Sequence, residues 1–235
     1  MKHKSKKKIR LFYDQFLAGG NDEERNDSGR IRLAVSLGKN ASIVLDAGCG
    51  TGSLTHLLTK ALSDSYVIGI DISRKSCEIA HNREWSQSKK VEFLVADLAY
   101  LPFRDSSFDL IIFSEVLEHI FPYEREKVLC ELQRVVKPCG HLLLTTPNGL
   151  HPIILLRIFL NWVSRGNIQL SNQIYDRPPT THSLIASLKN AGWKIKSLYF
   201  DNYSTGTRIR IRVPHLPVFA IQFLVVASPK VSVGV

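Results

Sequence analysis

The chain has 235 residues, of which 44% are hydrophobic and 22% are charged, a composition typical of a soluble globular protein. Its four cysteines form no CxxC pair and no cluster with zinc-ligand spacing, and no apolar run approaches the roughly 18 residues of a membrane-spanning helix. These features exclude a disulfide scaffold, a zinc-binding domain and a transmembrane protein, and they predict reduced thiols in a cytoplasmic protein.

The net charge of +10 is concentrated at the N-terminus, where residues 2–10 carry six lysines and arginines and no acidic residue. We interpret residues 1–10 as a basic, flexible and solvated tail, because charge-dense chain ends are seldom ordered. Contact with nucleic acid or with an anionic membrane surface is the alternative. The absence of repeats and low-complexity linkers predicts one domain over residues 11–230.

Strand and helix patterns alternate along the chain. Short apolar runs between turns predict strands, and apolar residues at helical spacing predict helices. Ser28 and Ser73 stand where N-caps are expected. In chain order we expect helices at 11–20 and 28–37, strand 42–48, helix 53–62, strand 66–71, helix 73–87, strands 91–98 and 108–114, helix 124–136, strand 137–148, helix 181–193 and strands 194–203 and 219–229.

This alternation predicts an α/β protein. Strands separated by helices form parallel sheets through right-handed crossovers, and the continuous apolar runs suit strands that are buried on both faces. We therefore expect a doubly wound sheet whose first strand-to-helix turn opens onto a ligand-binding crevice.

Three glycines occupy alternate positions in this turn, Gly48, Gly50 and Gly52, within the sequence LDAGCGTGSLT. Glycine lets a backbone turn sharply and approach a ligand closely. Dinucleotide-binding turns follow the pattern GxGxxG, which requires the third glycine at position 53, where this chain has Ser53. The spacing GxGxG, preceded by Asp46, disfavours a dinucleotide.

Polar residues end the following strands in order. Asp71 ends the second strand, where a carboxylate accepts hydrogen bonds from both hydroxyls of a ribose. Asp97 ends the third strand, within reach of an adenine amino group, and Ser114 ends the fourth. Each residue alone is explained equally well as a cap or turn, but the ordered set indicates a nucleoside cofactor.

The sequences VLDAGCGTGSLT, GIDIS, VEFLVADLAYLPFRDSSFDLIIFSEVLEHI and ELQRVVKPCGHLLLTTPN closely resemble the class I S-adenosylmethionine-dependent methyltransferases, in particular the type 11 methyltransferases of ubiquinone and menaquinone biosynthesis. The resemblance is strong over residues 40–150 and weaker over 180–230. It implies a Rossmann-like sheet of seven strands in the order 3-2-1-4-5-7-6, with strand 7 antiparallel and helices on both faces. It also implies S-adenosylmethionine as methyl donor, S-adenosylhomocysteine as product, and no metal.

The resemblance further implies donor-binding roles by position. Asp71 would hold the ribose hydroxyls, with Ile72 against the adenine. Asp97 would bond the adenine amine, Leu98 would cover the ring, and Ser114 would line the sulfonium end. The methionine part would be surrounded by Asp46, Gly48, Cys49, Gly50 and Gly52, and Tyr13 in the sequence FYDQF would fold over the cofactor.

A general base is expected where an oxygen or carbon acceptor must lose a proton. His119, just past the fourth strand, is our candidate, although packing or capping of a short helix there is the favoured alternative. His151 and His182 are second choices. We interpret Glu115 and Glu118 as surface residues or as groups behind the site.

Residues 150–182 are the least family-like part and are expected to form a substrate lid. The sequence at 151–166 is apolar nearly all round, which suits either a helix packed over the site or, with Trp162 and its flanking arginines, peripheral contact with a membrane. A lipid-linked acceptor reconciles both interpretations. In TRIRIRV, the alternating Arg208, Arg210 and Arg212 suit an edge strand protected by charge or, less simply, a site for a substrate anion.

The expected function is O- or C-methylation of a small molecule or of a lipid-, quinone- or sugar-linked acceptor. A nucleic-acid or protein methyltransferase is one alternative, but the Asn/Asp-Pro-Pro-aromatic motif of amino-methylating enzymes is replaced by SEVLEHI after the fourth strand. We therefore do not expect a nucleic-acid partner. A protein that binds the nucleoside cofactor without catalysis is the other alternative, and the oligomeric state is left open.

Overall fold

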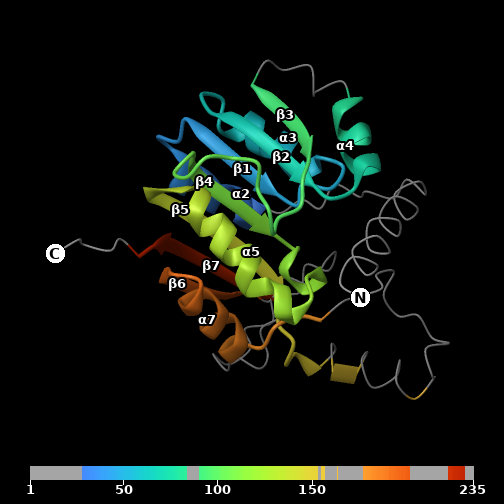
Figure 1. Ribbon diagram of the computed structural model, residues 1–235, viewed down its shortest axis with the longest axis vertical. Coiled ribbons are helices and arrows are strands. Elements are labelled where there is room, and N and C mark those ends of the chain that lie inside the picture. Colours follow the sequence, from blue (N-terminus) through green and yellow to red (C-terminus); the bar gives the residue numbers. More distant parts are fainter. Residues whose placement is uncertain are drawn as a thin grey trace.

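A mixed sheet with helices on both faces forms the described part of the chain (Figure 1). The computed structural model describes residues 28–83, 90–152, 155–156, 163, 177–201 and 222–230. The helices are α2 (Ser28–Gly38), α3 (Ser53–Ala61), α4 (Arg74–His81), the 3-10 helix η3 (Leu117–His119), α5 (Pro122–Val135) and α7 (Thr181–Asn190). The strands are β1 (Ile43–Ala47), β2 (Tyr66–Asp71), β3 (Val91–Val95), β4 (Phe108–Ser114), β5 (Val136–Pro147), β6 (Trp193–Asp201) and β7 (Gln222–Pro229).

The strands lie in the order β3-β2-β1-β4-β5-β7-β6. β1 pairs in parallel with β2 and β4, so that Val44 faces Val67 on one side and Leu110 on the other. The β2–β3 and β4–β5 pairs are also parallel, whereas β7 runs antiparallel to both β5 and β6. This topology confirms the predicted seven-stranded fold, including the antiparallel last strand.

Alternate residues of the strands enter two hydrophobic cores because successive side chains point to opposite faces of a sheet. On one face, Leu45 and Ile111 pack with residues of α5 and α7. On the other face, Val44 and Leu110 pack with Ala34 of α2 and with residues of α3. Burial on both faces explains the continuous apolar runs that the sequence shows.

The ends of several elements differ from the expected ones. Ser73 is the N-cap of α4 as predicted, since its side chain accepts a hydrogen bond from the Ser76 amide at 3.1 Å, but this helix ends at His81. Trp193 begins β6 and does not close the preceding helix, because Gly192 turns the chain there with φ +81°. The tail, Tyr13, the expected helix 11–20 and the arginines of TRIRIRV lie outside the described residues. Within the described ranges, no helix has the length and hydropathy to cross a bilayer.

Candidate active site

The glycine turn between β1 and α3 has a backbone that requires glycine. Gly48, Gly50 and Gly52 have φ values of +84°, +54° and +84°, a region that other residues rarely adopt. A Cβ at position 48 would lie 2.5 Å from Cγ2 of Val116, which joins β4 to η3, so the turn packs directly against the chain that follows β4. A Cβ at position 50 would meet nothing within 4 Å, so the turn is open at this residue.

The end of β2 holds this turn in place. The Ile70 carbonyl accepts hydrogen bonds from the amides of Gly48 and Cys49, both at 2.8 Å. The Asp71 carboxylate accepts one from the Gly50 amide at 2.9 Å through Oδ2 and one from the Ser73 amide at 2.8 Å through Oδ1. Asp71 is half-buried, and its carboxylate orders the turn by holding the amide of the open residue Gly50.

Asp46 lies beneath the turn and is 2% exposed. Its Oδ2 accepts a 2.6 Å hydrogen bond from Oγ1 of the buried Thr55, in the first turn of α3. Burial raises the pKa of Asp46 to about 6, with a smaller contribution from the charge of Asp71, while the Thr55 hydrogen bond opposes the shift. Asp46 therefore fastens α3 to the end of β1 from within the protein.

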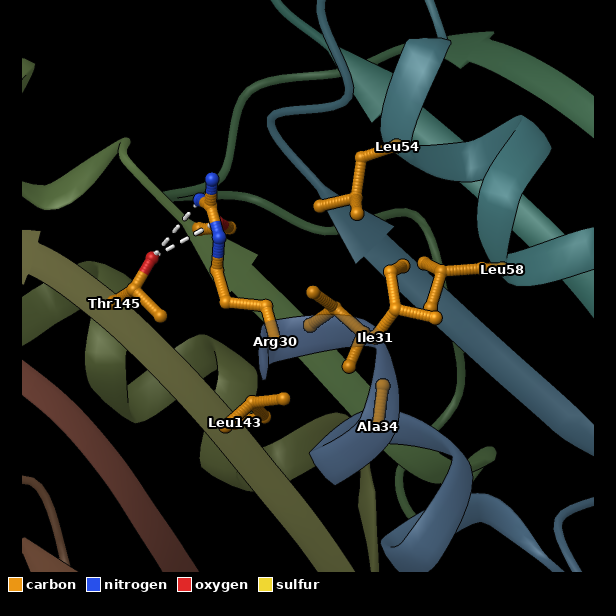
Figure 2. A pocket seen from close by; sticks show the side chains of 9 residues that line it. Arg30, Ile31, Ala34, Leu54, Leu58, Leu143 and Thr145 are labelled. Atoms are coloured by element: carbon orange, nitrogen blue, oxygen red, sulfur yellow. Dashed lines mark hydrogen bonds between the residues drawn. The ribbon is translucent and has the colours of Figure 1, made fainter. Parts of the chain in front are cut away.

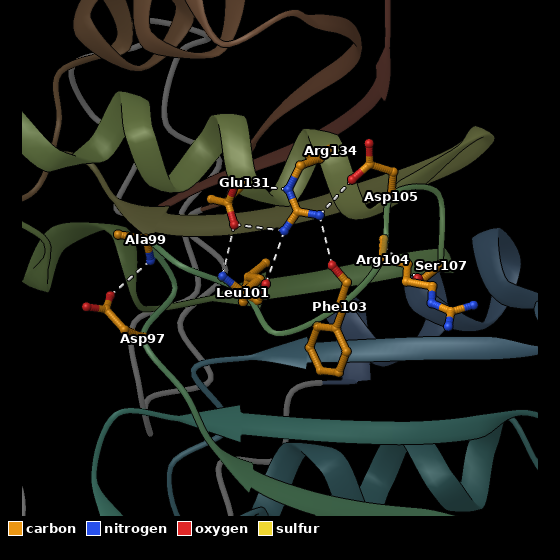
Figure 3. Close-up of polar contacts among 9 residues, drawn as sticks. All are labelled: Asp97, Ala99, Leu101, Phe103, Arg104, Asp105, Ser107, Glu131 and Arg134. Carbon is orange, nitrogen blue, oxygen red and sulfur yellow. Dashed lines mark hydrogen bonds and ion pairs between the residues drawn. The ribbon is translucent and has the colours of Figure 1, made fainter.

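The loop between β3 and β4 carries Asp97 and Leu98 and is held by Arg134 of α5 (Figure 3). Arg134 forms a two-point contact with Glu131 through Nε and Nη2, at 3.0 and 2.9 Å. It also donates to the Phe103 and Leu101 carbonyls at 2.8 and 3.1 Å. The Asp97 carboxylate accepts from the Ala99 amide at 2.9 Å, which closes the turn just after β3.

Arg30 of α2 reaches a small pocket between α2, α3 and the sheet (Figure 2). Its Nη1 donates to the Ser114 hydroxyl, which in turn bonds to the Thr145 hydroxyl at 2.8 Å. Thr145 donates to Oε1 of Glu115 at 3.0 Å, and Gln222 donates to the same oxygen. Ser114 is thus the only residue of this polar chain that the sequence analysis placed in the site.

His119 lies on η3, directly after the chain that packs against Gly48. Its Nε2 is 3.8 Å from Oε1 of Glu118, and its side chain is 16% exposed. Glu118 is 3% exposed and accepts a hydrogen bond from Thr146 at 2.9 Å, so it is a buried group behind His119 and the surface interpretation is wrong. His151 is buried, which lowers its pKa, whereas His182 is exposed at the start of α7.

Both ends of the expected lid are tied together next to η3. The Gly149 amide donates to the Pro179 carbonyl at 2.9 Å. The Arg177 amide donates to the Glu118 carbonyl at 3.0 Å. The buried Arg125 of α5 donates to the Ile120 carbonyl at 3.1 Å and to the Arg177 carbonyl. The segment between residues 149 and 179 therefore leaves and returns at the same place, beside His119.

Ile72 is half-buried between Asp71 and the cap residue Ser73, and Cys49 is buried within the glycine turn. The structure thus gathers the expected donor residues, apart from Tyr13, at the carboxyl ends of β1 to β4. Arg30 and Arg134 were missed, since a single arginine on a helix gives no sequence signal of what it contacts. Over the described ranges, no group of three or more His, Cys, Asp and Glu side chains is arranged to hold a metal ion.

Comparisons with known proteins agree with this geometry. Residues 45–144 match the family of the methyltransferase domain. The demethylmenaquinone methyltransferase of Lactobacillus johnsonii is 34% identical over 122 residues, which are 50% of this chain and 49% of that protein. An uncharacterized protein of Methanocaldococcus jannaschii is 29% identical over 85% of this chain and 73% of its own length. The mouse probable tRNA methyltransferase 9B is 36% identical over 49% of this chain and 24% of its own length.

Among solved structures, the N-methyltransferase NodS of Bradyrhizobium japonicum, in complex with S-adenosylhomocysteine, superposes with a TM-score of 0.65. The alignment covers 95% of this chain and 99% of NodS at 15% sequence identity, so it shows a shared fold. The chain spans about half the length of the first curated relative. The domain match over residues 45–144 contains the glycine turn, β2 to β4 and most of β1 and β5. Residues 45–144 therefore carry a methyltransferase domain, and the strand order and the glycine turn of the described residues fit the S-adenosylmethionine-dependent type.

Proposed function

We propose that this protein transfers the methyl group of S-adenosylmethionine to an oxygen or carbon atom of a small-molecule or lipid-, quinone- or sugar-linked acceptor. The binding of S-adenosylmethionine is supported by one observation, the open glycine turn that is hydrogen-bonded to Asp71. At Gly50 the turn leaves room where a side chain would stand, and the Asp71 carboxylate holds the amide of this residue. This is the environment that a nucleoside with a short charged chain requires.

The donor supplies a methyl group on a positively charged sulfur, so the chemistry is an in-line displacement in which the acceptor atom forms the new bond to carbon as the carbon–sulfur bond breaks. Asp71, whose carboxylate is held in place by the Gly50 and Ser73 amides, would accept hydrogen bonds from the ribose hydroxyls. Asp97 and Leu98 would take the adenine, beside Ile72. Gly48, Cys49, Gly50 and Gly52 would surround the methionine part, with Asp46 supporting them from below.

Ser114 and the residues that hold it would face the reacting end of the donor. Arg30, Ser114, Thr145 and Glu115 are joined in a continuous chain of hydrogen bonds, which holds this wall in one arrangement. A preorganised wall contributes to rate by fixing the approach of the acceptor. Its polar groups would orient an acceptor hydroxyl or carbonyl.

His119 is the base that we assign to an acceptor that must lose a proton. The buried Glu118 carboxylate, 3.8 Å from Nε2, stabilises the imidazolium that forms when His119 takes that proton. The backbone hydrogen bonds of Gly149 with Pro179 and of Arg177 with Glu118 hold the two ends of the segment 150–182 close to His119. This position supports the proposal that the segment is a lid over the acceptor.

Isothermal calorimetry with S-adenosylhomocysteine tests the donor site first. We expect binding by the wild type, no binding of NAD, and loss of S-adenosylhomocysteine binding in Asp71→Ala. Asp64→Ala, a change at a fully exposed aspartate, is the matched control and should bind normally. Normal affinity in Asp71→Ala would remove Asp71 from the site, and no binding by any variant would remove the enzymatic proposal.

The acceptor class is tested by transfer of labelled methyl groups to lipid extracts, quinone precursors and total tRNA in parallel. The similarity to demethylmenaquinone methyltransferase supports a quinone-like acceptor. The similarity to tRNA methyltransferase 9B makes tRNA the second candidate. Label in tRNA alone would replace the small-molecule proposal by the nucleic-acid one.

Peripheral membrane contact through residues 151–165 and the basic tail belongs to the same proposal. Leu155, Leu156 and Val163, the described apolar residues of the central part of this segment, are all exposed. Exposed apolar side chains next to basic residues suit an anionic lipid surface. Co-sedimentation with anionic liposomes, absent with neutral ones, is the expected result, and no co-sedimentation at low salt would contradict it.

A further inference from the structure

Side chains at the ends of β4 and β5 form a line of hydrogen bonds that leads away from Arg30. Oγ of Ser114 lies 2.8 Å from Oγ1 of Thr145, and Thr145 donates to Oε1 of Glu115 at 3.0 Å. Gln222 of β7 donates to the same carboxylate oxygen. At the other end, Nη1 of Arg30 donates to Ser114 and, at 3.4 Å, to Thr145. The line therefore has a cation at one end and a carboxylate at the other.

Glu115 keeps its place in this line at a conformational cost. Its φ is +56°, in the left-handed region that residues other than glycine rarely adopt. Its amide still donates to the Thr145 carbonyl at 3.0 Å, so β4 and β5 stay hydrogen-bonded up to the residue at which the chain turns. A glycine would adopt this backbone at a lower cost, which indicates a role for the carboxylate.

The carboxylate imposes a direction on the hydroxyl protons. A hydroxyl has one proton to donate and two lone pairs, and an ionised carboxylate can only accept. Thr145 gives its proton to Glu115, so Ser114 must be the donor in the contact between the two hydroxyls. The proton of Ser114 is thus committed to Thr145. Toward Arg30 or a ligand, the oxygen of Ser114 acts only as an acceptor.

A small pocket beside these hydroxyls limits what can reach them (Figure 2). It is lined by Arg30, Ser114 and Thr145 and by apolar side chains, among them Leu54 and Leu58, and its volume is about 10 Å³. Such a volume holds one group of the size of a water molecule. The positive charge of Arg30 disfavours a protonated amine there. A neutral hydroxyl fits in size, in charge and in the proton that it can donate.

We propose that the acceptor carries an anchoring hydroxyl, which enters this pocket and donates a hydrogen bond to Ser114, and that Glu115 is the positioning residue that keeps Ser114 an acceptor. This deepens the proposed function, on which it rests, because it names an alcohol or phenol group that the acceptor must present. The anchoring hydroxyl is held and keeps its proton, so His119 retains its role as base at the reacting atom. A ketone carbonyl, which can only accept, would face the lone pairs of Ser114 and bind more weakly.

Neutron diffraction from crystals of the deuterated full chain tests the proton order without any acceptor. We expect the deuteron of Thr145 between its Oγ1 and Glu115, and the deuteron of Ser114 between the two hydroxyl oxygens. A deuteron on Thr145 that points to Ser114 would overturn the proposal.

Cyclohexanol and cyclohexanone are the probes for the pocket, because they carry a hydroxyl and a carbonyl on the same ring. The full chain, labelled with ¹⁵N and saturated with S-adenosylhomocysteine, is titrated with each probe while the amide signals of Ser114 and Thr145 are followed. We expect cyclohexanol to bind about 3–10-fold more tightly, the difference that one net hydrogen bond makes. Equal affinities, or no response of either amide, would overturn the anchoring hydroxyl.

Variants of the line test the role of Glu115. Glu115→Gln should bring the affinity ratio of the two probes to about one, because an amide both donates and accepts and no longer directs the Thr145 proton. Thr145→Val should do the same, whereas Thr145→Ser should restore the preference. Glu126→Gln, at an exposed glutamate of α5, is the matched control. An unchanged ratio in Glu115→Gln would overturn the positioning role.

The affinity for S-adenosylhomocysteine should stay within about twofold in all these variants, which separates acceptor recognition from damage to the fold. Since Glu115→Gln and Thr145→Val change different residues, either one serves as the test if the other does not fold. If the wild type fails to bind S-adenosylhomocysteine, the proposed function is wrong, while the neutron map still decides the proton order.

Discussion

The two regions that we propose as the donor side and the acceptor side are held by different kinds of contacts. On the donor side, the glycine turn is fixed by β2, and the key bond joins residues only 21 positions apart, Gly50 and Asp71. On the acceptor side, Arg30 reaches Ser114 across 84 positions and Gln222 reaches Glu115 across 107, in each case through side chains. A local turn with special backbone angles leaves a sequence signature, whereas a wall assembled from distant side chains leaves none.

We expect the largest effect from His119→Gln, which should lower the rate of methyl transfer without changing the affinity for S-adenosylhomocysteine. With an acceptor that loses a proton, His119→Gln should lower the transfer rate by about 10²–10⁴-fold, the range for loss of a general base. Its affinity for S-adenosylhomocysteine should stay within about twofold, because η3 belongs to the acceptor side. Single-turnover rates and calorimetry measure the two quantities. An unchanged rate would leave His119 with a packing role.

Gly48→Ala should damage the fold of the donor side. The new Cβ would lie 2.5 Å from Val116 at a φ of +84°, which combines a strained backbone with overpacking. We expect a loss of about 2–5 kcal/mol in the free energy of unfolding, measured by urea denaturation.

Gly50→Ala is the control for that change, because its Cβ meets nothing within 4 Å. It should cost only about 1–2 kcal/mol of stability, from the left-handed backbone, yet should weaken S-adenosylhomocysteine, since the donor is expected in that space. Equal stability losses in the two variants would contradict the packing argument.

Asp46 makes the stability of the donor side depend on pH. Burial raises its pKa from 3.8 to about 6, so between these values the folded state binds more protons than the unfolded state, and stability falls as pH rises. Relative to Asp46→Asn, the wild type should lose about 2.4 kcal/mol between pH 4 and 7, since a shift of one pKa unit corresponds to about 1.36 kcal/mol. Urea unfolding of both proteins at the two pH values measures this difference. For the exposed Asp64→Asn, the free energy of unfolding should change with pH as it does in the wild type. The same pH dependence in Asp46→Asn would contradict the raised pKa of Asp46.

Arg134→Ala should give the smallest of these effects. It removes the contacts that hold the loop of Asp97 and Leu98, but the side chain is 30% exposed, so we expect a loss of about 1–2 kcal/mol in stability. Because this loop carries the two residues that we propose for the adenine, the affinity for S-adenosylhomocysteine should also fall, as measured by calorimetry. Arg104→Ala, in the same loop but exposed and directed away from Arg134 in Figure 3, should change neither quantity.

The sequence was sufficient for the fold. The alternating apolar runs predicted a doubly wound α/β sheet, and the resemblance to the class I methyltransferases implied the strand order and the antiparallel β7; these are confirmed, and residues 45–144 match the methyltransferase domain. Periodicity and turn chemistry are local, and both cores follow from them. The roles predicted for individual site residues, from Asp46 to Ser114, stay predictions, although the structure places these residues at the same end of the sheet.

The remaining features depended on contacts that no local pattern encodes. A glutamate is usually exposed, and nothing next to Glu118 in the sequence indicates otherwise. In the structure it is buried, with a hydrogen bond from Thr146 and an electrostatic interaction with the buried Arg125. Trp193 was assigned to a helix because the positive φ of Gly192 is invisible until the chain has folded.

The hydrogen bond between Gly149 and Pro179 has a consequence for how such a protein diversifies. Since the two ends of the intervening segment already meet, its loop is closed by the scaffold, and changing its length costs only about 0.6 kcal/mol for each doubling. We expect insertions and deletions between these two residues to leave the sheet and the proposed donor site intact. New acceptor specificities can then arise by changes within this one segment, while the rest of the fold stays the same.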